Sequence, residues 1–469
     1  PGGSSSPSGR EARLPAEGFA GLDESVRAVM AAAGVPGAAV GVLVGEEAYV
    51  AGHGVTNVDY PLPVDGDTLF QIGSITKTFT MAALVRLVDQ GRLDLDAPVQ
   101  RALPDLRLAD PEVAARVTLR HLLTHTSGLP ANDWATLGGG DDALARYVAT
   151  QGPTWPLLLP LGRAPSYSNI AFSVAGRVLE AVSGGPYAAA IEELLFAPLG
   201  MERATLSAAD AIVAATAAGH TVLEGRPHVQ RPWPMPHTGA PAGGIIASVG
   251  DLLRYARLWL RGGAGPDGAR LFTPAALAEI GRPQAPNPGF PLSFGLTWLL
   301  GEAGGVTFWN HDGVTLGQTA RLTVFPGHGV ALVALTNANT GVAVFRVVQE
   351  WVQEHVLGLA APPPPRVTPL PAGAAALAIY AGAYQNPGEA TLTLRVRDGG
   401  LDLTTQVEDP FVGSVRPALP PDPLVHLALA TPDEAYAVEA PEARAVFLRG
   451  AGGRIEGLLW GLRYNRRVG

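Results

Sequence analysis

The sequence predicts a mixed α/β fold of the α+β kind, in which an antiparallel sheet flanked by helices carries an inserted all-helical domain and is followed by a small β-unit. Strand-like runs stand at both ends of the segment 38–337. Between them, residues 69–290 are dominated by helix-like runs and by loops that Gly and Pro punctuate. Beyond a Pro-rich stretch, short runs of alternating apolar and polar residues indicate a β-barrel or sandwich.

The first unit is predicted from its elements in chain order. A helix is expected over 18–33, where Leu22, Val26 and Met30 recur at helical spacing. A hairpin is expected over 38–44 and 47–55. The remaining elements are strands at 294–300, 306–310, 318–325 and 330–337, and a closing amphipathic helix at 341–357. We expect these strands to form one antiparallel sheet, with the first and last helices packed against it.

The chain is expected to divide into four parts. These are a disordered Ser/Gly/Pro-rich tail at 1–16, a first globular domain at 17–358, a stiff Pro-rich linker at 359–373 and a β-domain at 374–469. The strands expected in the β-domain lie at 390–396, 401–405, 443–448 and 455–464. Because the linker follows a complete set of elements, a chain that ends near Leu359 is predicted to fold without the β-domain.

Composition limits the classes of function. With 47% hydrophobic residues among 469, the chain can bury more than one core. Its net charge of -9 and the lack of a basic patch argue against a nucleic-acid partner. No apolar run reaches the roughly 18 residues of a membrane span, so we expect a soluble chain, cytoplasmic or exported after a signal is removed. Because the sequence has no Cys, thiolate metal sites and Cys nucleophiles are excluded, and we expect neither metal nor cofactor.

The most informative residue is Lys77, because every other basic residue of the chain is an arginine. A guanidinium keeps its proton at physiological pH, whereas a desolvated ammonium can lose its proton and act as a base. Ser74 stands three residues earlier, at the start of a mostly apolar, helix-like stretch, so both side chains are expected on one helical face. We therefore predict that Ser74 is a nucleophile and Lys77 its base.

Two further tripeptides could complete such a site. Tyr167 and Asn169, in Tyr-Ser-Asn, offer a phenol whose pKa is expected to fall beside an ammonium and a carboxamide that could hold Lys77 or a substrate amide. The second tripeptide, His311-Asp312-Gly313, is expected to end one strand and open another. Gly313 lacks a side chain where a substrate backbone would approach. Each tripeptide is a weak signal by itself.

Taken together and in this order, the three motifs Ser-x-x-Lys, Tyr-x-Asn and His-x-Gly resemble those of the serine β-lactamase and penicillin-binding-protein-like family. The resemblance is greatest to the branch of class C β-lactamases, D-alanyl-D-alanine carboxypeptidases, D-aminopeptidases and esterases. It covers about 18–357 and implies a β-lactamase/transpeptidase-like fold. The β-domain resembles the lipocalin-like barrel of some peptidases of this branch, through Tyr380-Ala381-Gly382-Ala383-Tyr384.

The resemblance also implies roles for single residues. Ser74 would form an acyl-enzyme, with Lys77 and Tyr167 sharing the work of general base and proton relay. The oxyanion hole would be the backbone N–H groups of Ser74 and Val314. The substrate would be bound by three residues, Asn169, His311 and Gly313, with Asn169 also orienting Lys77 and His311 giving a polar or cationic contact to the substrate or to Tyr167.

The sequence leaves several functions open. A peptidase or amidase acting on small or D-configured peptides comes first, because His at position 311, where β-lactamases of this branch usually have Lys, is frequent among the D-peptidases. A β-lactamase and a carboxylesterase are the enzyme alternatives, and a penicillin-binding sensor that is acylated without turnover is the alternative outside catalysis. The expected partner is a small-molecule or short-peptide substrate, and the C-terminal domain could also build a homo-oligomer. His220, His228 and His237 are spaced too widely to favour a metal site.

Overall fold

The computed structural model describes residues 12, 14, 18–133, 135, 138–360, 366–397, 399–408 and 423–468. Most of the predicted tail and the centre of the predicted linker lie outside these residues. The central element is an eight-stranded sheet with the order β2-β1-β12-β11-β10-β9-β8-β7. Its strands are β1 (Gly37–Val44), β2 (Glu47–Gly54), β7 (Ala285–Pro286), β8 (Ser293–Phe294), β9 (Leu299–Ala303), β10 (Val306–Thr315), β11 (Gln318–Phe325) and β12 (Val330–Thr336). All of the pairings are antiparallel.

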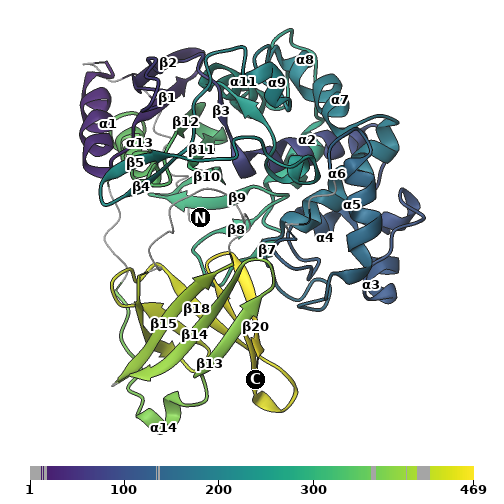
Figure 1. Ribbon diagram of the computed structural model, residues 1–469, viewed down its shortest axis with the longest axis vertical. Coiled ribbons are helices and arrows are strands. Elements are labelled where there is room, and N and C mark those ends of the chain that lie inside the picture. The colour runs from purple at the N-terminus through teal and green to yellow at the C-terminus, as the bar shows by residue number, and fades with distance from the viewer. Residues whose placement is uncertain are drawn as a thin grey trace, which may run out of the picture.

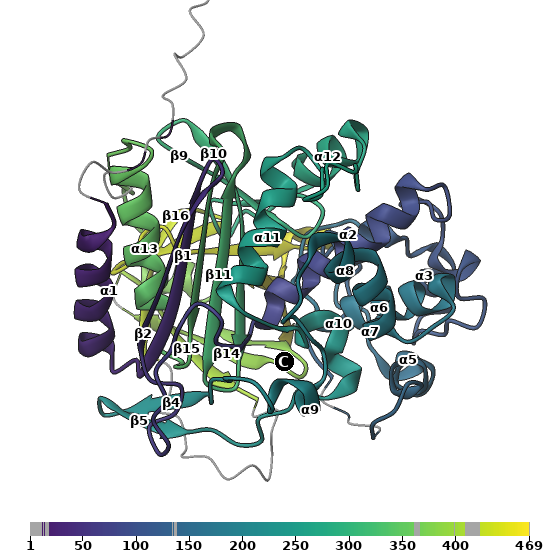
Figure 2. The ribbon, with the colours of Figure 1, turned by 90° about the horizontal axis from the view of Figure 1, so that it is seen from above.

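Helices cover both faces of this sheet, as the view from above shows (Figure 2). On one face lie α1 (Ala20–Ala33) and α13 (Val342–His355), the first and last helices of the unit. The other face carries α11 (Val249–Leu260). Both faces of β12 are apolar and buried, as expected for a central strand between two helical layers. The predicted sheet with flanking helices is therefore confirmed.

The insertion between β2 and β7 is predominantly helical and is centred on α2 (Thr76–Asp89), which is buried along most of its length. Its other helices are α3 (Pro111–Arg116), α4 (Leu119–Leu123), α5 (Ala143–Gln151), α6 (Asn169–Ser183), α7 (Tyr187–Ile191), α8 (Ala197–Leu199), α9 (Ala208–Ala211), α10 (Ala240–Gly243) and α12 (Pro274–Gly281). Two short antiparallel pairs complete it: β3 (Phe70–Gln71) with β6 (Ile246–Ala247), and β4 (His220–Leu223) with β5 (Arg226–Val229).

The C-terminal unit is a closed barrel of eight strands, preceded by α14 (Ala374–Leu377). Its strands are β13 (Gly382–Asn386), β14 (Ala390–Arg397), β15 (Gly400–Val407), β16 (Val425–Thr431), β17 (Glu434–Ala437), β18 (Arg444–Arg449), β19 (Ile455–Trp460) and β20 (Arg463–Val468). Pairing of β13 with β20 closes the ring, so no strand edge is left open. Alternate residues such as Leu392 and Leu394 fill the interior. The predicted barrel is confirmed.

Three predicted strand boundaries are wrong. The segment 294–300 is not one strand, because Thr297 adopts a left-handed backbone (φ 70°) that lets the chain bury Trp298. The strand expected to end at 310 continues through His311 to Thr315 as β10. The run 455–464 is two strands, β19 and β20, since Gly461 makes a tight turn at φ 58°.

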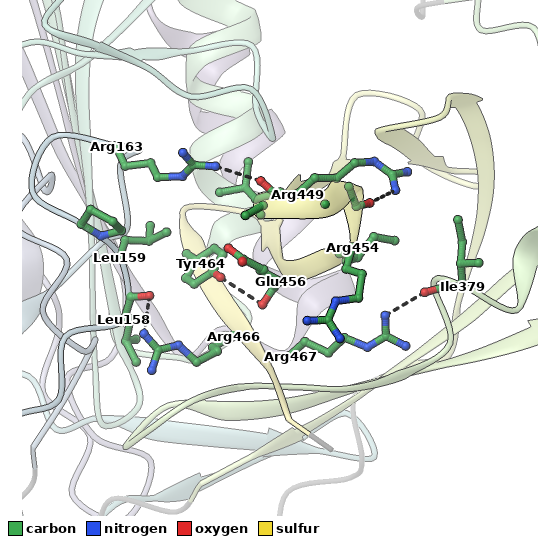
Figure 3. Close-up of a pocket in the computed structure, with 17 residues that line it drawn as sticks. Leu158, Leu159, Arg163, Ile379, Arg449, Arg454, Glu456, Tyr464, Arg466 and Arg467 are labelled. Carbon is green, nitrogen blue, oxygen red and sulfur yellow. Dashed lines mark hydrogen bonds between the residues drawn. The ribbon is translucent and has the colours of Figure 1, made fainter.

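The barrel packs against the side of the first unit that carries β7 to β9 (Figure 1). Leu158 and Leu159, from a loop of the helical insertion, pack in a buried apolar cluster with Val446, Leu459 and Tyr464 of the barrel. Two arginine contacts cross the same junction (Figure 3): Arg163 donates to the carbonyl of Arg449 at 3.0 Å and Arg466 to that of Leu158 at 2.8 Å. These residues border an open hollow of about 1210 Å³.

A chain that ends after Leu359 tests how far the two units depend on each other. It keeps every strand of the central sheet, so its circular dichroism should show folded protein. It also exposes Leu158 and Leu159 and removes the carbonyl of Leu462, which accepts the backbone N–H of Tyr167 at 2.8 Å. We expect a lower melting temperature and, because the loop that carries Tyr167 shifts, a loss of about 10²-fold in hydrolysis of a test ester. Unchanged activity of the shortened chain would contradict this dependence.

Candidate active site

Ser74 and Lys77 occupy one face of a continuous helical segment. A short 3₁₀ turn, Gly73–Ile75, leads directly into α2. Residues three apart on a helix are neighbours, and the Nζ atom of Lys77 lies 3.0 Å from the Oγ atom of Ser74. Lys77 Nζ also donates to the backbone carbonyl of Ala242 in α10, at 2.6 Å. The Lys77 amine is therefore held between the Ser74 hydroxyl and the Ala242 carbonyl.

The environment of Lys77 favours the neutral amine. The side chain is fully buried, and the part of the chain that the structure describes gives it no ion pair with a carboxylate. Burial lowers the pKa of Lys77 well below its usual value, and the positive charge of Arg463 lowers this pKa further. A neutral amine next to a serine hydroxyl carries the lone pair that a general base needs.

Tyr167 completes this group from the loop before α6. Its ring centre lies 4.8 Å from Lys77 Nζ, and an interaction with the Ser74 side chain lowers the pKa of its hydroxyl. The ring of His125 stacks on it at 4.2 Å between centroids. Burial raises the pKa of Tyr167 and outweighs the interaction with Ser74 and the charge of Arg463, which both lower it. The predicted fall of this pKa is therefore wrong, because the phenol is desolvated beside an amine whose charged form is itself disfavoured.

The edge of β10 runs past Ser74. Pairing between β10 and β9 ends at Asn310, whereas pairing with β11 continues to Thr315, so one edge of β10 lacks a strand partner from His311 onward. Gly313 lies against the turn of Ser74, and a Cβ atom at Gly313 would meet the carbonyl oxygen of Ile72 at 1.9 Å. Only glycine allows this approach, which brings the backbone of Val314 next to the turn.

His311 is buried and neutral. Its Nδ1 atom donates to the carbonyl of Asp312 at 2.8 Å, so Nε2 carries no proton. Nε2 has no hydrogen-bond partner among the described residues. Burial lowers the pKa of His311 to about 4, and the nearby Lys77 contributes to this shift. At neutral pH His311 therefore offers an acceptor, and a cationic contact is not available.

Asn169 is the first residue of α6, after the N-cap Ser168, whose hydroxyl accepts the N–H of Ala171 at 3.1 Å. Its Nδ2 atom donates to Oδ1 of Asn132 at 2.5 Å. In the described part of the chain, Lys77 bonds to Ser74 and Ala242, with no bond to Asn169. The expectation that Asn169 orients Lys77 is therefore wrong, because the Ala242 carbonyl takes that place.

A small cavity of about 110 Å³ opens at Ser74. Its polar wall includes Asn132, Asp133 and Asn169, and its apolar wall includes Ile170 and Met235. Val314 and Gly243 border it near the serine. The three predicted segments therefore meet around one cavity.

Sequence reasoning missed several groups that surround this site. Ala242 acts through its backbone and has no side-chain signal. Asn132, Glu389 and Arg463 lie in segments without a recognisable motif, and the last two belong to the barrel. His125, which belongs to none of the three motifs, packs against Tyr167. His220 lies in β4 and bonds to the carbonyl of Asn337. No described group of three or more His, Asp or Glu side chains could hold a metal ion.

A nucleophilic serine with a buried lysine and a tyrosine, set between a sheet edge and a helical domain, defines a serine hydrolase of the acyl-transfer class. Comparison with known families agrees with this class. The profile of the Beta-lactamase family matches residues 22–356, and the chain belongs to this family. Within the described residues, no helix is long and apolar enough to cross a membrane.

Three similar proteins extend over most of the chain. Penicillin-binding protein 4 of Amycolatopsis lactamdurans is 33% identical over 368 residues, which cover 76% of this chain and 94% of that protein. Unguisins hydrolase ungD of Aspergillus violaceofuscus is 26% identical over 439 residues, 79% of this chain and 76% of that one. The crystal structure of SurE with D-Leu superposes with a TM-score of 0.74 at 25% identity and covers 96% of this chain and 99% of that chain.

The pKa shifts predict the pH profile of acylation. The general base must be neutral, so kcat/KM for a p-nitrophenyl ester should rise with pH through the lowered pKa of Lys77 and level off well below the usual lysine range. The raised pKa of Tyr167 should keep the plateau to about pH 9 or beyond. His311→Gln should retain the acid limb, since His311 already lacks its proton above about pH 4. If kcat/KM of His311→Gln no longer fell at low pH, the fall in the unsubstituted protein would be due to protonation of His311.

Proposed function

We propose that the protein hydrolyses amide bonds of small peptides that contain D-configured residues, through an acyl-enzyme on Ser74. The observation that carries this proposal is the fully buried Lys77, whose Nζ atom lies 3.0 Å from the Ser74 hydroxyl without a carboxylate partner among the described residues. Such a lysine supplies a base at neutral pH, where an exposed lysine would be charged.

The proposed reaction uses groups that already surround Ser74. The neutral amine of Lys77 takes the hydroxyl proton as Ser74 Oγ attacks the substrate carbonyl. The backbone N–H groups of Ser74 and Val314 stabilise the oxyanion. Tyr167, which contacts both Ser74 and Lys77, passes the proton to the leaving amine. Water then attacks the acyl-enzyme by the reverse relay and regenerates Ser74.

Two features of the site support an amide substrate, and one similar structure supports D-configuration. Asn169 donates a hydrogen bond from Nδ2 to Asn132. Its side-chain oxygen can therefore accept an N–H of the substrate backbone. His311, neutral and with a bare Nε2, adds an acceptor where a lysine would add a cation. Of the similar structures, one was solved with D-leucine, and a relative is named a hydrolase.

A second candidate is a penicillin-binding protein that is acylated and does not turn over. The name of the relative from Amycolatopsis lactamdurans favours it. Both candidates require Ser74 to be acylated, and they differ in the rate at which the acyl group leaves. A β-lactamase or an esterase would use the same groups on another leaving group.

Substrate assays separate these candidates. We expect turnover of D-amino-acid p-nitroanilides above their L-isomers, slower opening of a chromogenic cephalosporin, and no long-lived adduct by intact mass. Ser74→Ala should abolish turnover and labelling by a fluorescent penicillin. A stable penicilloyl adduct without turnover would establish the binding protein, and preference for the L-isomers would refute the proposed stereochemistry.

The base role of Lys77 has its own test. Lys77→Arg keeps the positive charge but cannot give a neutral amine, so we expect both Lys77→Arg and Lys77→Ala to lose at least about 10²-fold in kcat/KM on a test ester. Tyr167→Phe should slow turnover while Ser74 remains labelled. If Lys77→Arg retained most of the activity, Lys77 would act only by its charge.

A further inference from the structure

We propose that Glu389 of the barrel is a positioning residue of the active site, which holds Arg463 against Tyr167 and, through Asn132, fixes the amide of Asn169. The inference rests on the proposed function of Ser74, Lys77 and Tyr167 and extends it to a domain that the three family motifs do not reach. It rests on a continuous series of contacts between the barrel and the two loops that contain Asn132 and Tyr167.

Both oxygens of the Glu389 carboxylate are engaged. Glu389 directly precedes β14 and lies beside the loop that contains Asn132. Its Oε2 atom accepts from Nδ2 of Asn132 at 2.5 Å, and Asn132 in turn accepts the amide of Asn169 at 2.5 Å. Its Oε1 atom forms an ion pair with Nη1 of Arg463 at 2.8 Å. One carboxylate therefore fixes two groups of the site at once.

Arg463 faces Tyr167 as the first residue of β20. Its guanidinium carbon lies 5.3 Å from the centre of the Tyr167 ring. Its Nε atom is buried and has no hydrogen-bond partner among the described residues. The charge of Arg463 reaches both catalytic groups, because it lowers the pKa of Lys77 and that of Tyr167. The negative charge of Glu389 acts on Tyr167 in the opposite direction.

Further hydrogen bonds hold both loops, the one with Asn132 and the one with Tyr167, to the barrel. Tyr167 donates its N–H to the carbonyl of Leu462 at 2.8 Å. Ala131 donates its N–H to Oδ1 of Asn386, at 2.9 Å. A Cβ atom on Gly388 would meet the carbonyl of Asn132 at 2.3 Å, so the backbones of these two segments are in contact. The carboxylate of Glu389 is thus held in a fixed relation to the site.

The titratable and charged groups around the catalytic pair come from four elements. His125 follows α4 and stacks on Tyr167, His311 and Asp312 belong to β10, and Arg463 and Glu389 belong to the barrel. His311 is uncharged at neutral pH, and the pKa of the buried His125 is also lowered. Arg463, Glu389 and Asp312 are therefore the fixed charges next to the pair, and Arg321 compensates Asp312 through an ion pair at 2.7 Å.

This balance predicts opposite effects for two substitutions that each remove one charge. Glu389→Gln leaves the charge of Arg463 uncompensated, so the pH profile of Ser74 acylation should move to lower pH. Arg463→Gln removes a positive charge beside Lys77, so the profile should move to higher pH. We expect about half a pH unit or more in each case, measured by the burst with p-nitrophenyl acetate. Glu442→Gln, an exposed carboxylate of the same barrel, is the matched control and should not shift the profile.

A third variant separates the two contacts of Glu389. Glu389→Gln keeps an oxygen that can accept from Asn132, whereas Glu389→Ala removes it. Because Asn132 fixes Asn169, Glu389→Ala should lose about tenfold more kcat/KM on a peptide p-nitroanilide than Glu389→Gln does. The two variants should show the same shift with p-nitrophenyl acetate. Asn132→Ala should reproduce the loss on the peptide without the shift, since Asn132 carries no charge.

The results have distinct meanings. Shifts of opposite sign, with none in Glu442→Gln, support the positioning role, and shifts of the same sign, or none, overturn it. If Arg463→Gln lowers the melting temperature too far for assay, Arg463→Lys takes its place: an unshifted profile then supports the charge effect, and a shift overturns it. Acylation by p-nitrophenyl acetate does not depend on the peptide preference, so failure of the D-peptide assay refutes the proposed substrate and leaves this test intact.

Discussion

The removal of Lys77 from water, with no carboxylate partner among the described residues, is the constraint on which the rest of the structure depends. Burying an ammonium unpaired is costly, so the folded chain favours the neutral amine. The amine remains a hydrogen-bond donor, and the carbonyl of Ala242 satisfies it. The helical layer around α2 and the ring of Tyr167 exclude water from the other sides. A neutral amine beside the serine hydroxyl is the chemical consequence of this packing.

The barrel takes part in the same constraint. Arg463 is a permanent cation beside a ring that contacts Lys77, and a second positive charge there makes the ammonium form still less favourable. Arg463 is itself partly buried, and Glu389 compensates its charge. The barrel therefore supplies both a charge and its counter-charge next to the catalytic tyrosine. The sequence predicts the barrel as a separate domain, but Arg463 and Glu389 of the barrel contact residues of the site.

The sequence predicted best where local spacing decides structure. Ser74 and Lys77 are three residues apart on a helix, and β11 was predicted with both ends correct because alternation and a Pro-Gly turn define it. Prediction failed where tertiary contacts decide. Thr297 leaves the strand conformation so that Trp298 can be buried, and the strand continues through His311 because β11 pairs with it there. The pKa of Tyr167 was predicted in the wrong direction because desolvation is set by distant residues.

The groups that no motif revealed share one property, which is that their role lies in a contact made across the fold. Ala242 contributes a backbone oxygen, and Asn132 and Glu389 are a polar pair separated by 257 residues in sequence. Spacing within a motif cannot report such pairs. The three motifs bring together Ser74, Lys77 and Tyr167, the groups to which we assign the roles of nucleophile, base and relay. Which substrate is attacked, and at which pH, also depends on the loop at Asn132 and on the barrel residues that hold it.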